Sequence, residues 1–588
     1  MVGRAHRLRF RRKMRMHRRQ VEAAGQQTDQ FVFRRLERLV NVRRFVFAWV
    51  GLVVIIIGCS VIQISSLSKY YQDLRPAPGG TYTEGVVGAF TNANPIYATS
   101  TADRTIAKLL FGGLLKYDEN NQLVGDLAEK WEPDTRGRVY TVTLRPDLRW
   151  SDGRPLTAED VLFTYKVIQN PDAGSPLYAS WQGVKVEAKD SRTIVFTLSN
   201  ALASFPYSLT NGIVPKHKLE AVPMGDMRST SFNTSQPIGS GPFKWQNLTV
   251  DGTGETREEK IILEANNLYY SGRPKLDTFI VRTFRTEPQI IDHYNKHELN
   301  GMIGLIDPDQ SISEQMQFYS FPQTAAMMTF FKTTEGVLAD KTVRQALVRA
   351  TDTKAIRNTL PYAAKPVDAP LLKGQLGYDK SLAQFGYDPA QAEKQLTDAG
   401  WVAARPGQVR EKEGKKLEFT LYAESSKEAA RTTQLLQQQW RKIGANAKVE
   451  LQNSNDFQVT LSQHSYDALL RGISIGNDPD VFVYWHSTQA DVLASSRLNF
   501  SEYKSNVVDE AIESARTRLD PNLRIAKYKP FLTAWRDDAP AVGLYQPRVL
   551  YITRDPVYGL HDHTVVSASD RFANVNEWQI RLVKTTVD

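Results

Sequence analysis

The segment from Phe45 to Ile64 contains no charged residue and consists mainly of aliphatic and aromatic side chains. Because a helix rises about 1.5 Å per residue, about 20 such residues span roughly 30 Å, the thickness of the hydrocarbon core of a bilayer. We therefore predict a transmembrane anchor over residues 45–66. The chain on either side of it is then expected on opposite sides of a membrane.

Charge predicts the direction of this anchor. Residues 1–44 contain 14 Lys and Arg residues and three acidic ones, whereas the rest of the chain has 60 basic and 61 acidic residues. The positive-inside rule places the basic tail, residues 1–44, in the cytoplasm and everything after about Ser66 outside. The near-neutral body disfavours nucleic-acid binding, so the tail is expected to contact anionic lipid or an acidic partner.

Cys59, the only cysteine of the sequence, allows a second interpretation of the apolar segment. Ile56, Ile57 and Gly58 precede it as in a lipobox, which would make the protein a lipoprotein anchored at Cys59. The long tail and the apolar residues that continue to Ile64 favour an uncleaved anchor. Either anchor tethers the body to the outer face of the membrane, and one cysteine forms no disulfide framework within the chain.

The exported body begins near Thr81, after a predicted linker over residues 67–80 that contains Pro and Gly. Alternation at 417–421 and 449–451 predicts two strands. Between them, Ser425 to Glu428 has the spacing of a capping box, and Gly444 is a typical residue after a helix end. This strand, helix and strand unit predicts parallel pairing with the helix on the sheet.

Two further helices have clear start signals. Asp388 and Pro389 predict an N-cap and a first helical residue, with Gly400 closing the helix. Thr157 predicts another N-cap, followed by acidic residues that complement the helix dipole. With strands between such helices, we expect a mixed α/β body with more than one sheet.

Seven short segments occur in an order typical of one family. They are 94–97 (NPIY), 113–117 (GLLKY), 127–131 (LAEKW), 150–161 (WSDGRPLTAEDV), 238–243 (IGSGPF), 272–277 (GRPKLD) and 343–347 (VRQAL). From about residue 80 onward the chain resembles the family 5 extracellular solute-binding proteins of ATP-binding-cassette importers, the peptide- and nickel-type class that includes dipeptide- and oligopeptide-binding proteins. Most of these residues are expected to have structural roles.

The resemblance implies an α/β, two-lobed clamp of the periplasmic-binding-protein type II kind, joined by two hinge strands. Its first lobe is expected over residues 81–285, with an extra subdomain at about 111–220, and over a C-terminal return at 541–588. The second lobe is expected over 286–540. The resemblance also implies peptide or peptide-like ligands, permease and ATPase partner subunits, and no cofactor; we expect a monomer.

The ligand-contacting loop of the family falls at residues 469–487. In peptide-binding members an aspartate shortly after a Gly-Trp pair binds the α-ammonium of the ligand, but here Ile473 replaces the tryptophan and Gly476 or Ile475 replaces the aspartate. Asp478 is the candidate substitute. The other candidate ligand contacts are the backbone of Gly472, Ile473 and Ser474, the indole of Trp485, and Asn92 and Tyr97 near the first strand.

Enzymatic chemistry finds little support in the sequence. His293 and His297 have the spacing of a zinc-binding pair on one helical face, but Tyr294 stands where the general-base glutamate belongs. His561 and His563 have no evident third ligand. The sequence has no phosphate-binding loop and no nucleophile elbow, so no metal site or catalytic residue is predicted.

These observations predict a receptor that closes around a peptide and hands it to an importer, not an enzyme. The alternative is a surface sensing or adhesion protein that has kept the clamp fold without a permease. The long basic tail favours this alternative. Because the expected aspartate is missing, we predict that the ligand is held mainly by main-chain bonds and apolar pockets.

Overall fold

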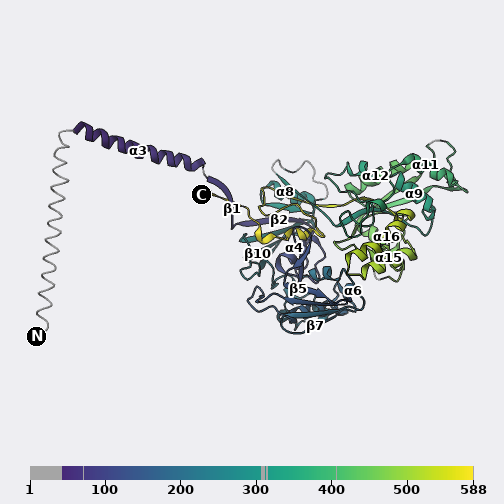
Figure 1. Ribbon diagram of the computed structural model, residues 1–588, viewed down its shortest axis with the longest axis horizontal. Helices are drawn as coiled ribbons and strands as arrows, with labels where there is room; N and C mark the ends of the chain where they lie inside the picture. Colours follow the sequence, from purple (N-terminus) through teal and green to yellow (C-terminus); the bar gives the residue numbers. More distant parts are fainter. Residues whose placement is uncertain are drawn as a thin grey trace. The chain divides into compact units, whose positions relative to one another are not determined.

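The computed structural model describes residues 43–70, 72–305, 312, 316–405, 407–494 and 496–586. Of the predicted basic tail, only Arg43 and Arg44 lie among them. The chain divides into two compact units (Figure 1). One contains the residues up to Arg75 and 582–588, and the other runs from Pro76 to Arg581.

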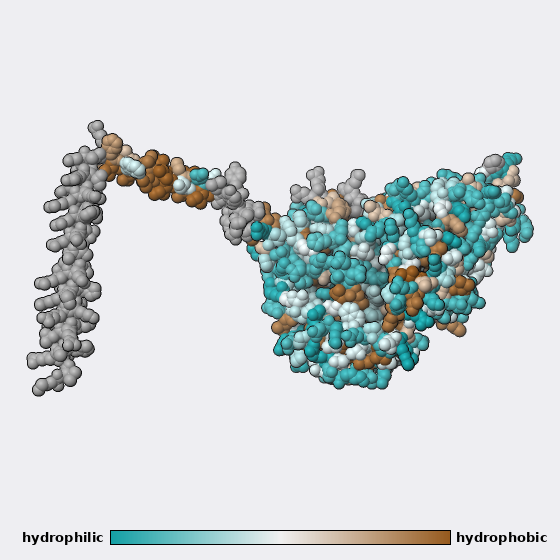
Figure 2. All heavy atoms as spheres, in the orientation of Figure 1, coloured by the Kyte–Doolittle hydropathy of each residue, from teal (hydrophilic) through white to brown (hydrophobic). Residues whose placement is uncertain are grey.

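The first unit contains helix α3 (Arg43–Tyr70), whose segment Phe45–Ile64 is long and apolar enough to cross a membrane. Figure 2 shows the apolar surface of this helix. α3 extends past the predicted end of the anchor, and β1 (Gln72–Ala77) pairs with β22 (Arg581–Thr586) where a linker over 67–80 was expected. The linker prediction was wrong for these residues. It rested on the loss of a regular apolar pattern, and exposed helices and strands also lack such a pattern.

The second unit begins with a seven-stranded sheet that forms lobe 1. Its order is β13 (Gln317–Pro322), β21 (Arg548–Thr553), β12 (Gly301–Ile303), β2 (Thr81–Val87), β11 (Thr278–Phe284), β10 (Glu258–Ala265) and β9 (Phe243–Asp251). β2 is parallel to both of its neighbours, and the other pairs are antiparallel. Helix α4 (Thr101–Leu110) packs on one face of this sheet, and α8 (Glu287–Asn295) packs on the other.

α8 approaches β2 closely at Gly85. A Cβ atom at this residue would lie 2.8 Å from Ile290 Cδ1 and 2.7 Å from Leu299 Cδ1. Such distances are too short for carbon atoms, so the side chains of Ile290 and Leu299 would have to shift if Gly85 were replaced.

The extra subdomain carries a four-stranded antiparallel sheet. Its order is β5 (Ala128–Pro133), β6 (Val139–Leu144), β8 (Thr193–Thr197) and β7 (Lys185–Ala188). The remaining strands and α-helices of this part are β3 (Leu115–Tyr117), β4 (Leu123–Gly125), α5 (Ala158–Ile168), α6 (Tyr178–Trp181) and α7 (Lys216–Leu219). Its apolar side chains belong to the same core cluster as those of the seven-stranded sheet, so the subdomain is packed firmly onto lobe 1.

Lobe 2 contains a five-stranded sheet. Its order is β18 (Asn446–Gln452), β17 (Glu418–Glu424), β19 (Ala468–Ser474), β14 (Ala325–Phe331) and β20 (Ala541–Tyr545). Separate apolar cores cover its two faces, and Figure 1 shows the helices of this lobe around the sheet. The first lies under α9 (Lys341–Arg349), α11 (Pro389–Asp398) and α12 (Lys427–Lys442), and the second under α13 (Ser454–Gln463), α15 (Asn506–Arg516) and α16 (Pro521–Asp538). Short elements complete the lobe: α10 (Thr353–Arg357), β15 (Glu411–Lys412), β16 (Lys415–Lys416) and α14 (Phe482–Trp485).

The lobe boundaries differ from the predicted ones. β12 and β13 lie beyond residue 285 yet belong to the sheet of lobe 1, whereas β20 starts at Ala541 and belongs to the sheet of lobe 2. The chain therefore crosses between the lobes after Pro322 and after Tyr545. A three-residue strand such as β12 carries too little alternation to be recognised in a sequence.

The predicted local patterns are largely present. β17 and β18 pair in parallel, α12 lies between them in the chain, and Gly444 follows the helix with a φ of 81°. Asp388 caps α11, and Thr157 forms a capping box with Asp160 at the start of α5. The predicted capping box at Ser425 is wrong, because Ser426 is the N-cap of α12 and accepts a hydrogen bond from the Ala429 amide.

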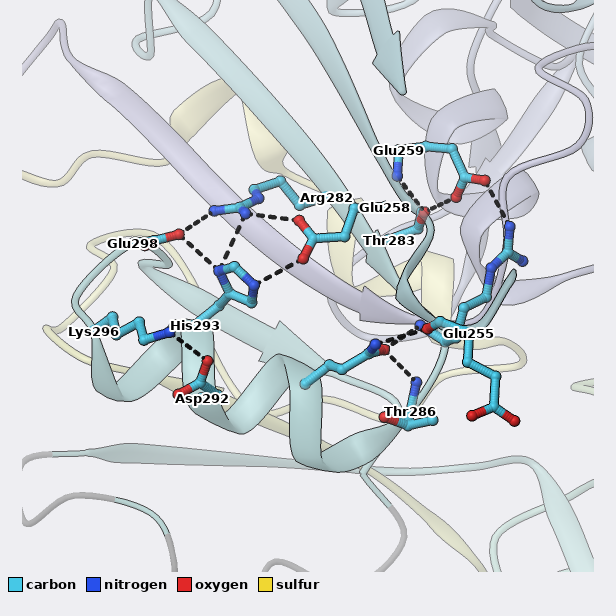
Figure 3. A network of polar contacts seen from close by, with 12 residues as sticks. Glu255, Glu258, Glu259, Arg282, Thr283, Thr286, Asp292, His293, Lys296 and Glu298 are labelled. Carbon is cyan, nitrogen blue, oxygen red and sulfur yellow. Dashed lines mark hydrogen bonds and ion pairs between the residues drawn. The ribbon is translucent and has the colours of Figure 1, made fainter. Parts of the chain in front are cut away.

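Polar side chains link β10, β11 and α8 on lobe 1 (Figure 3). His293 Nε2 lies 2.8 Å from Glu258 Oε1, and His293 Nδ1 lies 2.7 Å from Glu298 Oε2. Arg282 contacts the same two carboxylates at 2.9 and 2.8 Å. His297 follows the end of α8 with a φ of 63°, so it does not share a helical face with His293 as the spacing suggested.

Candidate binding cleft

Two chain segments join the lobes, and a cleft lies beside them. The Gln323 amide donates to the Pro547 carbonyl at 2.9 Å, and Gln546 Nε2 donates to the Gln323 carbonyl at 3.2 Å. The cleft has a volume of about 640 Å³. Its lining residues come from lobe 1 (Thr101, Ile303, Gly304, Leu305, Val549, Leu550, Ala568), the joining segments (Gln323, Pro547, Arg548) and lobe 2 (Met327, Tyr362, Glu424, Ser425, Ser426, Glu428, Ala429, Phe457, Leu470, Arg471, Gly472, Tyr545).

Strand β19 borders the cleft with an open edge. It pairs with β14 along its full length, but its pairing with β17 covers only Ala468 to Leu470. Within the described parts of the chain, no strand pairs with this edge from Arg471 to Ser474. Backbone groups at such an edge can bind an extended chain by strand addition.

A carboxylate and two tyrosines form the polar wall of lobe 2. The Tyr545 hydroxyl donates to Glu428 Oε1 at 2.8 Å, and the Tyr362 hydroxyl donates to Glu428 Oε2 at 3.0 Å. Burial, followed by the charge of Glu428, raises the pKa of both tyrosines. Both hydroxyls therefore stay protonated and hold the carboxylate in place at neutral pH.

Arg471 and Glu424 form a second polar pair in the cleft. Arg471 Nη1 lies 4.0 Å from Glu424 Oε2, and the guanidinium carbon lies 5.5 Å from the centre of the Phe457 ring. Burial lowers the pKa of Arg471, while Glu424 opposes this shift. The guanidinium remains charged at neutral pH because its ordinary pKa is above 12. The cleft thus offers groups of both signs beside the open edge of β19.

Of the three predicted backbone positions, only Gly472 lines the cleft. Ile473 is 2% exposed and packs in the core of lobe 2. The Ser474 carbonyl accepts a hydrogen bond from the Tyr484 hydroxyl at 2.8 Å. The side chain of Ile473 is therefore structural, as expected for alternate residues of a strand with one buried face.

Asp478 does not line the cleft. Its two oxygens accept hydrogen bonds from Arg524 Nη1 and Nη2, both at 2.7 Å, and both side chains are buried. The predicted role as ammonium partner finds no support in this geometry, because a carboxylate held bidentately by arginine is already neutralised. Trp485 is fully buried against Phe330 and Trp535, so its indole forms part of the core.

Asn92 and Tyr97 also have structural roles. The Asn92 side chain accepts from the Asn94 amide at 2.8 Å, and the Tyr97 hydroxyl donates to the Ala173 carbonyl at 2.9 Å. Both residues are almost fully buried. Neither lines the cleft. They stabilise the loop between β2 and α4, whose following residue Thr101 does line it.

The charged residues and the tyrosines that line the cleft are not among the contacts predicted from the sequence. Glu428 was interpreted as a partner in helix capping, although it is directed at Tyr362 and Tyr545. These three residues are far apart in sequence, so no local spacing connects them. The only available signal was the position of Arg471, which directly precedes the predicted contact Gly472.

The fold and the cleft define a two-lobed solute-binding protein. The model of the bacterial extracellular solute-binding proteins, family 5, matches residues 122–492, and the chain belongs to this family. The resemblance found in the sequence is thereby confirmed, as is the two-lobed fold. The family consists of binding proteins.

Several known proteins are similar over most of the chain. The oligopeptide-binding protein AppA of Bacillus subtilis is 27% identical over 508 residues, which cover 84% of this chain and 91% of that protein. Its structure in complex with a nonapeptide superposes with a TM-score of 0.68 at 26% identity, covering 86% of this chain and all of that one. NikZ from Campylobacter jejuni in complex with Ni(L-His) has a TM-score of 0.71 at 27% identity, covering 85% and 99%.

Proposed function

We propose that this protein is a membrane-anchored receptor that binds peptides outside the cytoplasm and delivers them to an ATP-binding-cassette importer. The observation that carries the proposal is the cleft between the lobes, bordered by the open edge of β19, in a chain of a solute-binding family. The similarity to a protein solved with a nonapeptide supports a peptide as the ligand. Binding is not coupled to chemistry in this proposal, so the protein is a receptor and not an enzyme.

The ligand is held mainly through its main chain. Arg471 and Gly472 offer strand-edge backbone groups in the cleft, and the partly exposed Met327 offers an apolar contact beside them. Main-chain pairing is independent of ligand sequence, which suits a receptor for diverse peptides. Glu424 and Glu428 are the carboxylates of the cleft and the partners for any cationic group that the ligand carries.

Helix α3 anchors the receptor. Its apolar part matches the thickness of a bilayer, and Arg43 and Arg44 precede it on the side proposed as cytoplasmic. Cys59 lies inside the helix, which continues to Tyr70. This continuity favours an uncleaved anchor over a lipid attached at Cys59.

Replacement of Gly472 by leucine tests the position of the ligand. A Cβ at Gly472 would meet only Met327 Cε, at 3.6 Å, so the new side chain enters the cleft without distorting the protein. We expect the affinity of the full chain in detergent for a random nonapeptide mixture to fall about tenfold or more, measured by calorimetry. Gly386→Leu is the matched control, because Gly386 has open space around it and lies outside the cleft.

Acetylation of the peptide N-terminus tests how the ligand is recognised. Main-chain recognition predicts nearly equal affinities for free and acetylated nonapeptides. A charge-assisted pair with the ammonium would instead make acetylation cost roughly tenfold to a hundredfold. If such a loss occurs and disappears in Glu428→Gln, the ligand ammonium binds Glu428 and recognition is not mainly through the main chain.

Co-purification distinguishes the importer receptor from a sensing or adhesion protein. The proposal predicts that permease and ATPase subunits are recovered with the full chain from membranes. Recovery of unrelated cytoplasmic proteins through residues 1–44, without transport subunits, would favour the sensing function.

A further inference from the structure

Contacts between the lobes occur at a second place, away from the joining segments. They connect the extra subdomain of lobe 1 with the loop at 477–480 and the end of α15 in lobe 2. None of the residues in these contacts lines the cleft between the lobes. They therefore join the lobes without belonging to the proposed ligand site.

Asp480 is at the centre of these contacts. Its Oδ2 accepts hydrogen bonds from Ser204 Oγ of lobe 1 and from Arg516 Nη2 of lobe 2, both at 3.0 Å. The Arg516 carbonyl in turn accepts a hydrogen bond from the Ala203 amide at 2.9 Å. One ion pair of lobe 2 is thus bound to two consecutive residues of lobe 1.

Two further contacts flank Asp480. Asn477 Nδ2 donates to the Asn121 carbonyl at 2.6 Å, and the two asparagine side chains are also hydrogen-bonded to each other. Leu519, just beyond α15, lies against Gly137 in the turn between β5 and β6, where a Cβ would be 3.2 Å from Leu519 Cγ. The contact surface is thus polar around Asp480, with the apolar contact between Leu519 and Gly137 beside it.

We infer that these residues, Asn121, Ser204, Asn477, Asp480 and Arg516, form a latch that holds the lobes closed and thereby sets the affinity of the cleft. The inference rests on the proposed receptor function, since a clamp binds ligand tightly only in its closed form. The apparent dissociation constant of such a protein is the intrinsic one divided by the closed fraction. A residue that never touches the ligand can therefore change its affinity.

The chemistry of the latch suits a contact that must open again. Asp480 keeps Arg516 as a partner within lobe 2 after the lobes separate, so opening leaves no buried, unpaired charge. Asn121, Ser204 and Asn477 are polar and can bond to water instead. A large apolar contact here would make opening much more costly.

Spin labels test the latch in the full chain without ligand. Cys59 is exposed in α3 and is first replaced by serine, and labels are then attached at Lys130→Cys in lobe 1 and Lys394→Cys in lobe 2. We expect Ser204→Ala and Asp480→Asn to shift the interlabel distances toward larger values and to weaken binding of the nonapeptide mixture about tenfold. The double variant should add little to the single ones, because both single changes act on the hydrogen bond between Ser204 and Asp480.

Asp491→Asn is the matched control, because this aspartate lies in an exposed loop of lobe 2 and bonds locally to the Leu493 amide. Unchanged distances between the spin labels in Ser204→Ala and Asp480→Asn would show that these residues do not hold the lobes closed. Shifted distances together with no binding of nonapeptides by the parent chain would support the latch and refute the peptide receptor. Lowered affinity with unchanged distances would overturn the latch while the receptor function stands.

Discussion

The two lobes each contain a buried arginine and carboxylate pair, but the pairs join very different parts of the chain. In lobe 1, Arg571 binds Glu84, and both side chains are 0% exposed. In lobe 2, Arg524 binds Asp478, with side-chain exposures of 7% and 8%. The first pair spans 487 residues of sequence and the second spans 46.

The pair in lobe 1 attaches the C-terminal return to the central strand β2. The Tyr551 hydroxyl, on β21, also donates to Glu84 at 2.7 Å, so it accepts a hydrogen bond from the Tyr82 hydroxyl at 2.6 Å. Burial raises the pKa of both tyrosines. A discontinuous lobe has no chain connection to hold its two parts together, so this network supplies a specific contact at the place where they meet.

The pair in lobe 2 fixes a loop near the other lobe. Burial opposes the charge of Arg524, but the hydrogen bonds and the charge of Asp478 outweigh it and raise the pKa of the guanidinium. Asp478 lies between Asn477 and Asp480, the two latch residues of this loop. The comparison indicates that one pair completes a lobe and the other positions a contact between lobes.

Arg571→Met should have the largest effect on stability. It leaves Glu84 buried without its charged partner, and such a change typically costs about 3–5 kcal/mol. We expect a lower urea midpoint and faster hydrogen exchange in β2 and β21, measured on the full chain in detergent. The double variant Glu84→Leu/Arg571→Met should recover much of the loss, because no unpaired charge remains. A loss below about 1 kcal/mol in the single variant would show that the pair does not hold the lobe together.

Asp478→Asn should have an intermediate effect. Asparagine keeps the shape but removes the charge, and loss of a charge-assisted hydrogen bond in a nearly buried site costs about 2 kcal/mol. Faster hydrogen exchange is expected in the loop at 477–480 and in the first turns of α16. The ratio of affinities for free and acetylated nonapeptides should stay unchanged, because Asp478 does not line the cleft and its carboxylate binds Arg524. A changed ratio would restore Asp478 as the ammonium partner.

The sequence predicted the parts of this fold that depend on neighbouring residues. The apolar helix at 45–64, the parallel unit at β17 and β18 and the caps at Thr157 and Asp388 all follow from local spacing. The family resemblance added the two lobes. The lobe boundaries were misplaced because membership of β12 in a sheet depends on pairing with β2 and β21, which is a tertiary property.

The site was predicted less well than the fold. Gly472 alone among the seven candidates lines the cleft. Asp478 and Trp485 lie in the right segment, but a sequence does not reveal that Arg524 and the core residues Phe330 and Trp535 already engage them. Glu428 was missed because its two tyrosine partners, Tyr362 and Tyr545, are brought to it only by the folding of lobe 2.

Glu298 is a third carboxylate that binds an arginine, but it lies at the protein surface. We expect its replacement to change stability less than the replacements in the two buried pairs. Arg282, followed by His293, holds the pKa of Glu298 at about 2 (Figure 3). The side chain of Glu298 is 43% exposed, so solvent screens the pair and Glu298→Gln should cost no more than about 0.5 kcal/mol at neutral pH.

A pKa below the ordinary value means that the ionised form is favoured in the folded state. The contribution of ionised Glu298 to the free energy of unfolding is therefore complete above about pH 4.5 and is lost as the pH falls toward 2. We expect the urea midpoints of the native chain and Glu298→Gln to differ slightly at pH 6, to differ less at pH 3 and to converge near pH 2, with the pH 6 difference reduced in 1 M salt. A difference that persists unchanged at pH 2 would show that Glu298 acts through packing rather than through its charge.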